Sequence, residues 1–239
     1  MNRSTDFAVV AVAGDGAAGR ALADALARSG RRVTAGDVPA EAELVVADGS
    51  DLAATTALLL QAAGRVGEDV PLVTTSSAVS VTEVAAALPN PGRVAGLRLF
   101  ENGPGRGTVE VVRGLRTEES IVDRLAALAD DLPDATAVVV GDRPGFLLDA
   151  LFLPYLNDVI QELDDGLATA EDIDLALRLG LGYAAGPFEL LDRMGLDVHL
   201  RATQAVYEAT GDARYAPPPL LRRMAAAGRA FRSAETPEN

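Results

Sequence analysis

The chain has 239 residues, 49% of them apolar, which is enough for one large domain or two unequal domains with a real core. Acidic residues outnumber cations by 35 to 21, and the net charge of −14 argues against nucleic acid as a partner, although it would equally serve solubility alone. Cys and Lys are absent, which excludes disulfides, thiolate nucleophiles, Schiff-base lysines and a P-loop lysine. No metal site is predicted.

The sequence also bears on cellular location. It contains no apolar run long enough to span a membrane, and its start, MNRSTDFAVV, lacks the basic and apolar regions of a cleavable signal peptide. We therefore predict a cytoplasmic protein that does not bind membranes.

Strand-like and helix-like patterns alternate through the first 142 residues. FAVVAVA (7–13) is a continuous apolar run of strand length, and the following GDGAAGRALADALARSG changes at once to helical spacing. Further strands are predicted at 32–37, 43–48, 70–75 and 136–142, a hairpin around a Gly/Pro turn at 94–114, and helices at 51–66, 81–88 and 118–131. Ser80 and Glu83 form a capping box at the start of helix 81–88.

From Pro144 onward the strand patterns stop, and helical patterns follow one another between Gly and Pro residues. This change of pattern predicts a Rossmann-like NAD(P)-binding domain at 1–142 and an all-helical domain at 143–239. The fold class is thus α/β, with a shortened and mostly parallel sheet followed by helices.

A glycine motif lies where the first strand gives way to the first helix. Gly14, Gly16 and Gly19 match G-x-G-x-x-G, in which the glycines permit a tight turn, the approach of a pyrophosphate and close packing of helix and strand. A strand-to-helix turn with chance glycines in a Gly-rich chain is the alternative.

Asp37 ends the second predicted strand, 23 residues after Gly14. A carboxylate at this place bonds a ribose 2′-hydroxyl and repels a 2′-phosphate. The cofactor predicted from these residues is therefore NAD and not NADP.

Three stretches carry a resemblance to a known family. PGFLLDALFLPYLNDVI, EDIDLALRLGLGYAAGPFELLDRMGLDV and TVEVVRG together resemble the L-3-hydroxyacyl-CoA dehydrogenase family, from about residue 7 to residue 224. The resemblance implies an NAD-dependent oxidoreductase of fatty acid metabolism with a Rossmann-type domain, a dimer-forming helical domain, and an acyl-CoA thioester held between them.

The resemblance also implies roles for residues of this chain. The family's catalytic histidine follows Gly-Leu in the first hairpin strand, where this chain has Arg98, while its glutamate corresponds to Glu110. The serine that bonds the substrate oxygen corresponds to Ser77, or in another register to Ser76, and the asparagine that does the same is Asp149. Arginine stays protonated and cannot take a proton from an alcohol, so the His–Glu pair of the family is lost.

The only histidine, His199, lies in the helical half and has no counterpart role in the family. We expect it to be a core or surface residue, with a relocated catalytic base as the alternative.

The chain is also shorter than the family pattern after Asp37. Only VPAEA (38–42) separates two predicted strands where the family has a helical excursion that contacts CoA. A parallel return along a five-residue strand and across two strand spacings takes about 20 Å, so five or six residues must run nearly extended and no helix fits. The contacts to CoA that this excursion supplies in the family are therefore not expected in this chain.

Arg98 and Glu110 lie on the two strands of the predicted hairpin. They are expected to form an ion pair across the strands; the alternative is that Arg98 offers its guanidinium to a carboxylate, phosphate or thioester oxygen of a ligand.

Two functions follow from this sequence. One is NAD-dependent hydride transfer on a 3-hydroxyacyl thioester with altered or weakened chemistry. The other is a non-catalytic family member that binds NAD or a partner. The helical half is expected to form a homodimer or to pair with a complete dehydrogenase.

Overall fold

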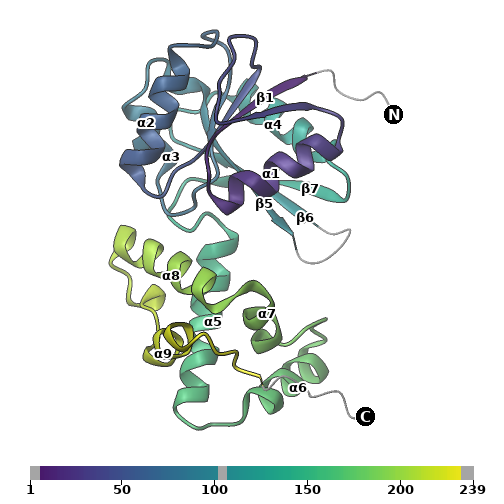
Figure 1. Cartoon of the computed structure of the whole chain (residues 1–239), viewed down its shortest axis with the longest axis vertical. Helices are drawn as coiled ribbons and strands as arrows, with labels where there is room; N and C mark the ends of the chain where they lie inside the picture. Colours follow the sequence, from purple (N-terminus) through teal and green to yellow (C-terminus); the bar gives the residue numbers. More distant parts are fainter. Residues whose placement is uncertain (1–5, 102–106, 233–239) are drawn as a thin grey trace. The chain divides into compact units, whose positions relative to one another are not determined.

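The computed structural model describes residues 6–101 and 107–232, which divide into two compact units, 1–147 and 148–239. The first unit alternates strands and helices, and the second is helical (Figure 1). None of the helices in the described ranges has the length and apolar character needed to cross a bilayer.

The first unit is built on one sheet of seven strands in the order β2-β1-β3-β4-β5-β6-β7. Its strands are β1 (Val9–Gly14), β2 (Arg32–Ala35), β3 (Leu44–Asp48), β4 (Leu72–Thr74), β5 (Val94–Glu101), β6 (Gly107–Arg113) and β7 (Ala135–Gly141). Every neighbouring pair is parallel except β5 and β6, so the expected Rossmann-like, mostly parallel sheet is confirmed.

Helices cover both faces of this sheet (Figure 1). One face packs against α1 (Ala17–Arg28) and α4 (Glu119–Asp130), whose apolar residues recur at helical spacing and include Leu22 and Leu125. The other face packs against α2 (Leu52–Ala63) and α3 (Val81–Ala86). Alternate residues of the central strands therefore enter two separate cores, which explains why these strands are continuous apolar runs.

The connection between β2 and β3 crosses β1, because both strands pair with β1. Residues 36–43, all of which are described, contain no helix, as the short spacing predicted. The strand β2 is consequently left at the edge of the sheet.

The hairpin β5–β6 brings together the two strands predicted to pair. Its register places Arg98 directly opposite Glu110 on the sheet face that also carries Val112. The Gly/Pro turn predicted between the strands falls on residues 102–106, which lie outside the described residues.

The second unit contains five α-helices in its described part, besides a short 3-10 helix at Ala213–Tyr215, and no strand there interrupts them. They are α5 (Leu148–Asp164), α6 (Ala170–Leu181), α7 (Pro187–Met194), α8 (Leu196–Thr210) and α9 (Pro219–Ala227). Helix α5 supplies Leu156 and Ile160 to a core that also contains Phe188 of α7 and Leu221 of α9.

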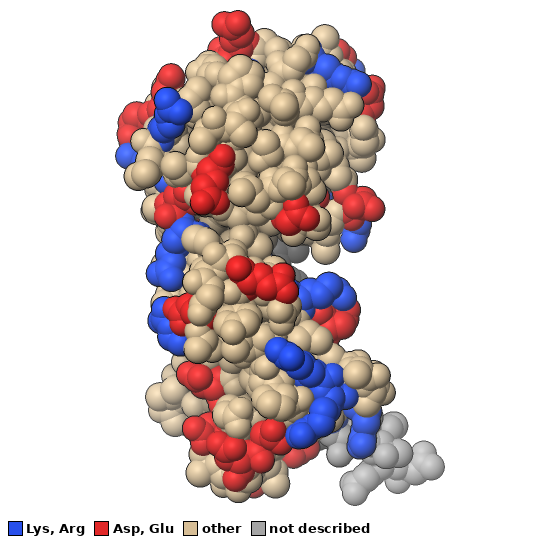
Figure 2. Space-filling model, turned by 90° about the vertical axis from the view of Figure 1, so that its left-hand side faces the viewer, with Lys and Arg blue, Asp and Glu red and all other residues tan. Residues whose placement is uncertain are grey.

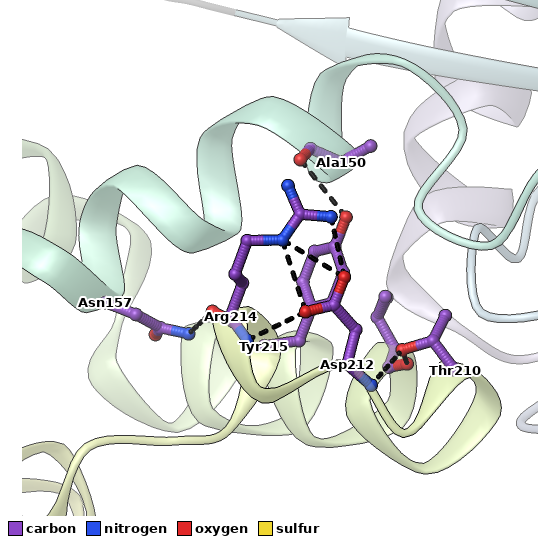
Figure 3. A network of polar contacts seen from close by, with 7 residues as sticks. Ala150, Asn157, Thr210, Asp212, Arg214 and Tyr215 are labelled. Atoms are coloured by element: carbon purple, nitrogen blue, oxygen red, sulfur yellow. Dashed lines mark hydrogen bonds and ion pairs between the residues drawn. The ribbon is translucent and has the colours of Figure 1, made fainter.

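A polar network crosses the interior of this unit. Asn157 of α5 donates to the Thr203 hydroxyl at 2.8 Å and to the Arg214 carbonyl at 3.2 Å, and Thr203 donates to the Tyr215 carbonyl at 2.8 Å. The Tyr215 hydroxyl donates to the Ala150 carbonyl at 3.2 Å (Figure 3). The network holds the turn between α8 and α9 against α5.

His199 is fully buried beside this network, so it is a core residue, the first of the two roles expected for it. Its Nε2 lies 3.0 Å from Oδ1 of Asn157, and its Nδ1 makes no hydrogen bond among the described residues. Burial lowers the pKa of His199 to about 4, and the charge of Asp149 opposes this only in part.

This buried histidine makes the second unit sensitive to acid. The unfolded chain takes up the proton near pH 6.5 and the folded chain only near pH 4, so the free energy of unfolding should fall as the pH drops through this window. The loss from this group is about 1.4 kcal/mol per pH unit and about 3 kcal/mol in total. All four tyrosines lie in residues 155–215 and Trp is absent, so tyrosine fluorescence in urea reports on this unit.

We expect His199→Gln to lessen the dependence of unfolding free energy on pH between 6.5 and 4, whatever its effect at pH 7. Parallel curves for the two proteins across that window would show that His199 does not titrate as its burial requires.

Candidate functional site

The glycine motif forms the turn from β1 into α1. Gly14 has a φ of +96°, which other residues rarely adopt, and Gly16 is the N-cap of α1 in an extended conformation. The helix has no side-chain cap of its own and no acidic residue in its first turn. Its N-terminus thus meets the requirements of an anion-binding turn.

Asp48 at the end of β3 approaches this turn. The parallel register sets Asp48 beside Gly14, and Oδ2 of Asp48 accepts a hydrogen bond from the Gly19 N–H at 2.5 Å. The sequence spacing gave no sign of this contact, because the two strands that create it are separated by a helix and by β2.

Asp37 follows β2, and its side chain is 80% exposed. Nη1 of Arg65, which follows α2, lies 3.3 Å from Oδ1 of Asp37. A cavity of about 100 Å³ adjoins this pair. It is lined by Ala13, Gly14, Gly36, Val38, Leu58, Gln61, Ala62 and Arg65.

Three predicted catalytic residues, Ser77, Arg98 and Glu110, belong to the first unit. Arg98 and Glu110 lie opposite each other on the hairpin, and residues 145–147 connect Glu110 to Ser77. Glu110 is fully buried, and its Oε1 accepts the N–H of Leu147 at 2.9 Å. Arg98 is half-buried directly opposite. The carbonyl of Ser77, a buried residue, accepts the N–H of Gly145 at 2.6 Å, so the segment before α5 is bonded to both Ser77 and Glu110.

Asp149 belongs to the second unit, in the first turn of α5. It is 3% exposed and acts electrostatically on His199. An ionised carboxylate can only accept hydrogen bonds, whereas an asparagine at the same place would also offer two N–H donors.

Comparison with known proteins connects both units to one family. The model of the 3-hydroxyacyl-CoA dehydrogenase NAD binding domain matches residues 50–143, and that of the C-terminal domain of the same enzymes matches residues 145–236. The chain belongs to the 3-hydroxyacyl-CoA dehydrogenase family. The resemblance seen in the sequence is confirmed, and NAD is the cofactor that membership implies.

Individual relatives agree with the family models. A 3-hydroxybutyryl-CoA dehydrogenase of Mycobacterium tuberculosis is 38% identical over 160 residues, covering 67% of this chain and 56% of the relative. A probable 3-hydroxybutyryl-CoA dehydrogenase of Bacillus subtilis is 38% identical over 157 residues, covering 66% and 54%. The chain thus matches little more than half the length of these relatives.

Solved structures extend the likeness to nearly the whole chain. FadB2 of M. tuberculosis superimposes with a TM-score of 0.85 at 28% identity, covering 95% of this chain and 99% of that one. The (S)-3-hydroxybutyryl-CoA dehydrogenase PaaH1 of Ralstonia eutropha gives 0.82 at 25% identity, covering 96% and 100%. The family model of the NAD binding domain begins only at residue 50, after the glycine motif and Asp48, so the first 49 residues follow the family in fold more than in sequence.

The residues of the first unit fit NAD at three points and conflict with it at one. The glycine turn, the N-terminus of α1, which has no side-chain cap of its own, and Asp37 with its neighbouring cavity suit the pyrophosphate and the adenosine side. Asp48 conflicts, because its carboxylate is bonded to an amide that a pyrophosphate would use.

The pair formed by Asp37 and Arg65 leads to a prediction about cofactor choice. Asp37→Ala should lower the preference for NADH over NADPH by about tenfold, because Arg65 would remain beside the ribose to bond a 2′-phosphate. Arg65→Ala is the matched control and should raise the same preference. The ratio of the two dissociation constants, from calorimetry, is the measurement, and a ratio unchanged in both variants would place the ribose elsewhere.

Proposed function

We propose that this chain is an NAD-dependent oxidoreductase of 3-hydroxyacyl thioesters whose chemical step is slow. The observation that supports this is the pair on the hairpin: Arg98 stands at the position of the family's base, directly opposite the buried Glu110. Membership of the family supports hydride transfer as the reaction, and Arg98 and Glu110 are the side chains that would make it slow.

The cofactor would be held by the residues already described. The N-terminal amides of α1, in the turn that Gly14, Gly16 and Gly19 make possible, would hold the pyrophosphate, and Asp37 would bond the ribose hydroxyls. When bound, NAD would accept the hydride from the substrate carbon that bears the hydroxyl. The same step must also release the hydroxyl proton to a base.

In this proposal neither Arg98 nor Glu110 is suited to accept the hydroxyl proton. The Arg98 guanidinium stays protonated and can only donate hydrogen bonds, to a substrate oxygen or to Glu110. Glu110 is fully buried, and its Oε1 already accepts the N–H of Leu147. Ser77 and Asp149 would then orient the substrate oxygen, with Asp149 the less suited because it lacks an N–H donor.

A second candidate is a non-catalytic subunit that binds NAD or a partner dehydrogenase. It is favoured by the two charges that stand at reacting or binding positions, Arg98 and Asp48. Binding of NADH with no turnover even after a base is restored would support it over the first.

Turnover tests the proposal directly. We expect the unmodified protein to reduce acetoacetyl-CoA with NADH about 10²- to 10⁴-fold more slowly than an ordinary dehydrogenase, because the residue that exchanges the hydroxyl proton, a general acid in this direction and a general base in the oxidation, is lost. Arg98→His should recover part of this rate, and Asp149→Asn should add to the recovery. Arg98→Gln, which removes the charge without adding a base, is the matched control and should recover little.

The recovered rate should fall again when Glu110→Gln is added to Arg98→His, since the glutamate then no longer supports the histidine. A kcat of roughly 1–10³ s⁻¹ in the unmodified protein, insensitive to Glu110→Gln, would show that the base lies elsewhere.

We further propose that the second unit assembles, with a second copy or with a complete dehydrogenase. Large apolar side chains are exposed along α6 and the turn after it, including Leu175 at 52%, Leu179 at 78% and Leu181 at 62%. Grouped exposed apolar residues of this kind mark interaction surfaces. The substrate class proposed with this assembly is an acyl-CoA or a related thioester.

Light scattering at micromolar concentration should therefore give the mass of a dimer, and Leu179→Glu should shift it to the monomer. Leu115→Glu, at a residue of the first unit that is 90% exposed, is the matched control and should leave the mass unchanged. A monomer before any substitution, with no co-purifying dehydrogenase, would refute the assembly.

A further inference from the structure

The glycine turn contains a negative charge that belongs to the protein itself. The carboxylate of Asp48 lies against Gly16 and Gly19, with Oδ2 at 2.5 Å from the Gly19 nitrogen. Asp48 is half-buried as the last residue of β3, so the sheet register fixes its backbone beside Gly14.

The glycines of the motif make room for this carboxylate. A Cβ on Gly16 would overlap the Asp48 carboxylate, and a Cβ on Gly19 would come within 2.8 Å of the Asp48 Cβ. By contrast, a Cβ on Gly36, a glycine at the end of β2, would meet nothing within 4 Å. The space that two glycines leave open in the turn is therefore filled by Asp48.

Helix α1 supplies no anion to its positive end from its own N-cap or first turn. Its own first turn contains no acidic residue, and its N-cap, Gly16, has no side chain. A carboxylate from a neighbouring strand satisfies this helix end in the same way as a bound phosphate would. Asp48 therefore occupies the helix end that would hold a pyrophosphate, and the two negative groups would repel each other.

We propose that Asp48 is an internal competitor of the dinucleotide, which can bond the turn only after the Asp48 carboxylate has left the Gly19 amide. This inference rests on the proposed function, since it takes an NAD-type dinucleotide as the ligand. Asp48 thus lowers the affinity for the pyrophosphate part of the ligand and does not affect the binding of its adenosine part.

Calorimetric titration of the full chain with three ligands tests the assignment. Asp48→Asn should tighten the binding of NADH and of ADP-ribose by about tenfold or more, because the repelling charge is removed. Adenosine, which has no phosphate, should bind both proteins equally.

Asp51→Asn is the matched control. Asp51 also bonds the N-terminus of a helix, accepting the Ala54 N–H at 2.8 Å, but the helix is α2, and asparagine caps helices as well as aspartate does. The variant removes one negative charge three residues away and should bind ADP-ribose as the unmodified protein does.

A measurement on the unmodified protein covers the case in which Asp48→Asn does not fold. In ¹⁵N-labelled protein saturated with ADP-ribose, the Gly19 amide signal should shift strongly, because its bond to Asp48 is replaced. An unmoved Gly19 signal at saturation would overturn the inference.

The remaining outcomes separate this inference from the proposed function. Equal affinity of the unmodified protein and Asp48→Asn for ADP-ribose, or an equal gain for adenosine, would overturn the competition and leave NAD binding intact. If neither protein binds NADH, both the competition and the NAD-dependent function are wrong.

Discussion

Side-chain carboxylates bonded to main-chain N–H groups hold this molecule together at the ends of its helices. Asp48 bonds the start of α1, Asp142 bonds the N–H groups of Val81 and Thr82 at the start of α3, and Asp174 bonds those of Phe188 and Glu189 at the start of α7. The chain has 14 more acids than cations, so many carboxylates lack a cation to pair with. Helix amides serve instead, and each contact also joins segments far apart in sequence. Figure 2 shows the acidic side chains spread among uncharged ones on the face it draws.

The same interaction explains part of the glycine pattern. Gly186 precedes α7 as Gly16 precedes α1, and a Cβ on Gly186 would overlap Asp174 as a Cβ on Gly16 would overlap Asp48. Burial raises the pKa of Asp174, while its two amide bonds and Arg232 act against the rise. A glycine before a helix can thus admit either a ligand phosphate or a carboxylate of the chain itself. The glycine in the sequence does not tell which of the two occupies the space.

This ambiguity marks the limit of what the sequence predicted. Strands and helices followed from the period of apolar residues, and the register that sets Arg98 opposite Glu110 followed from two adjacent strands and a short turn. These are local patterns. The contact of Asp48 with the glycine turn depends on strand order, which places β3 beside β1 after an intervening helix and strand. The burial of His199 against Asn157 likewise depends on the packing of α5 with α8, so sequence alone left it between core and surface.

The residues proposed for the chemistry differ in how far the fold constrains them. Glu110 is fully buried and satisfies the Leu147 N–H, so its loss would leave that amide without its acceptor, a cost of about 1–3 kcal/mol if the amide stays buried. This hydrogen bond gives Glu110 a structural role beside the one proposed for it in catalysis. Arg98 is only half-buried on the facing strand, so the fold constrains its side chain less than that of Glu110. A base can be lost at such a position while the hairpin, its register and the buried glutamate stay in place, so the fold of a dehydrogenase persists independently of its reaction.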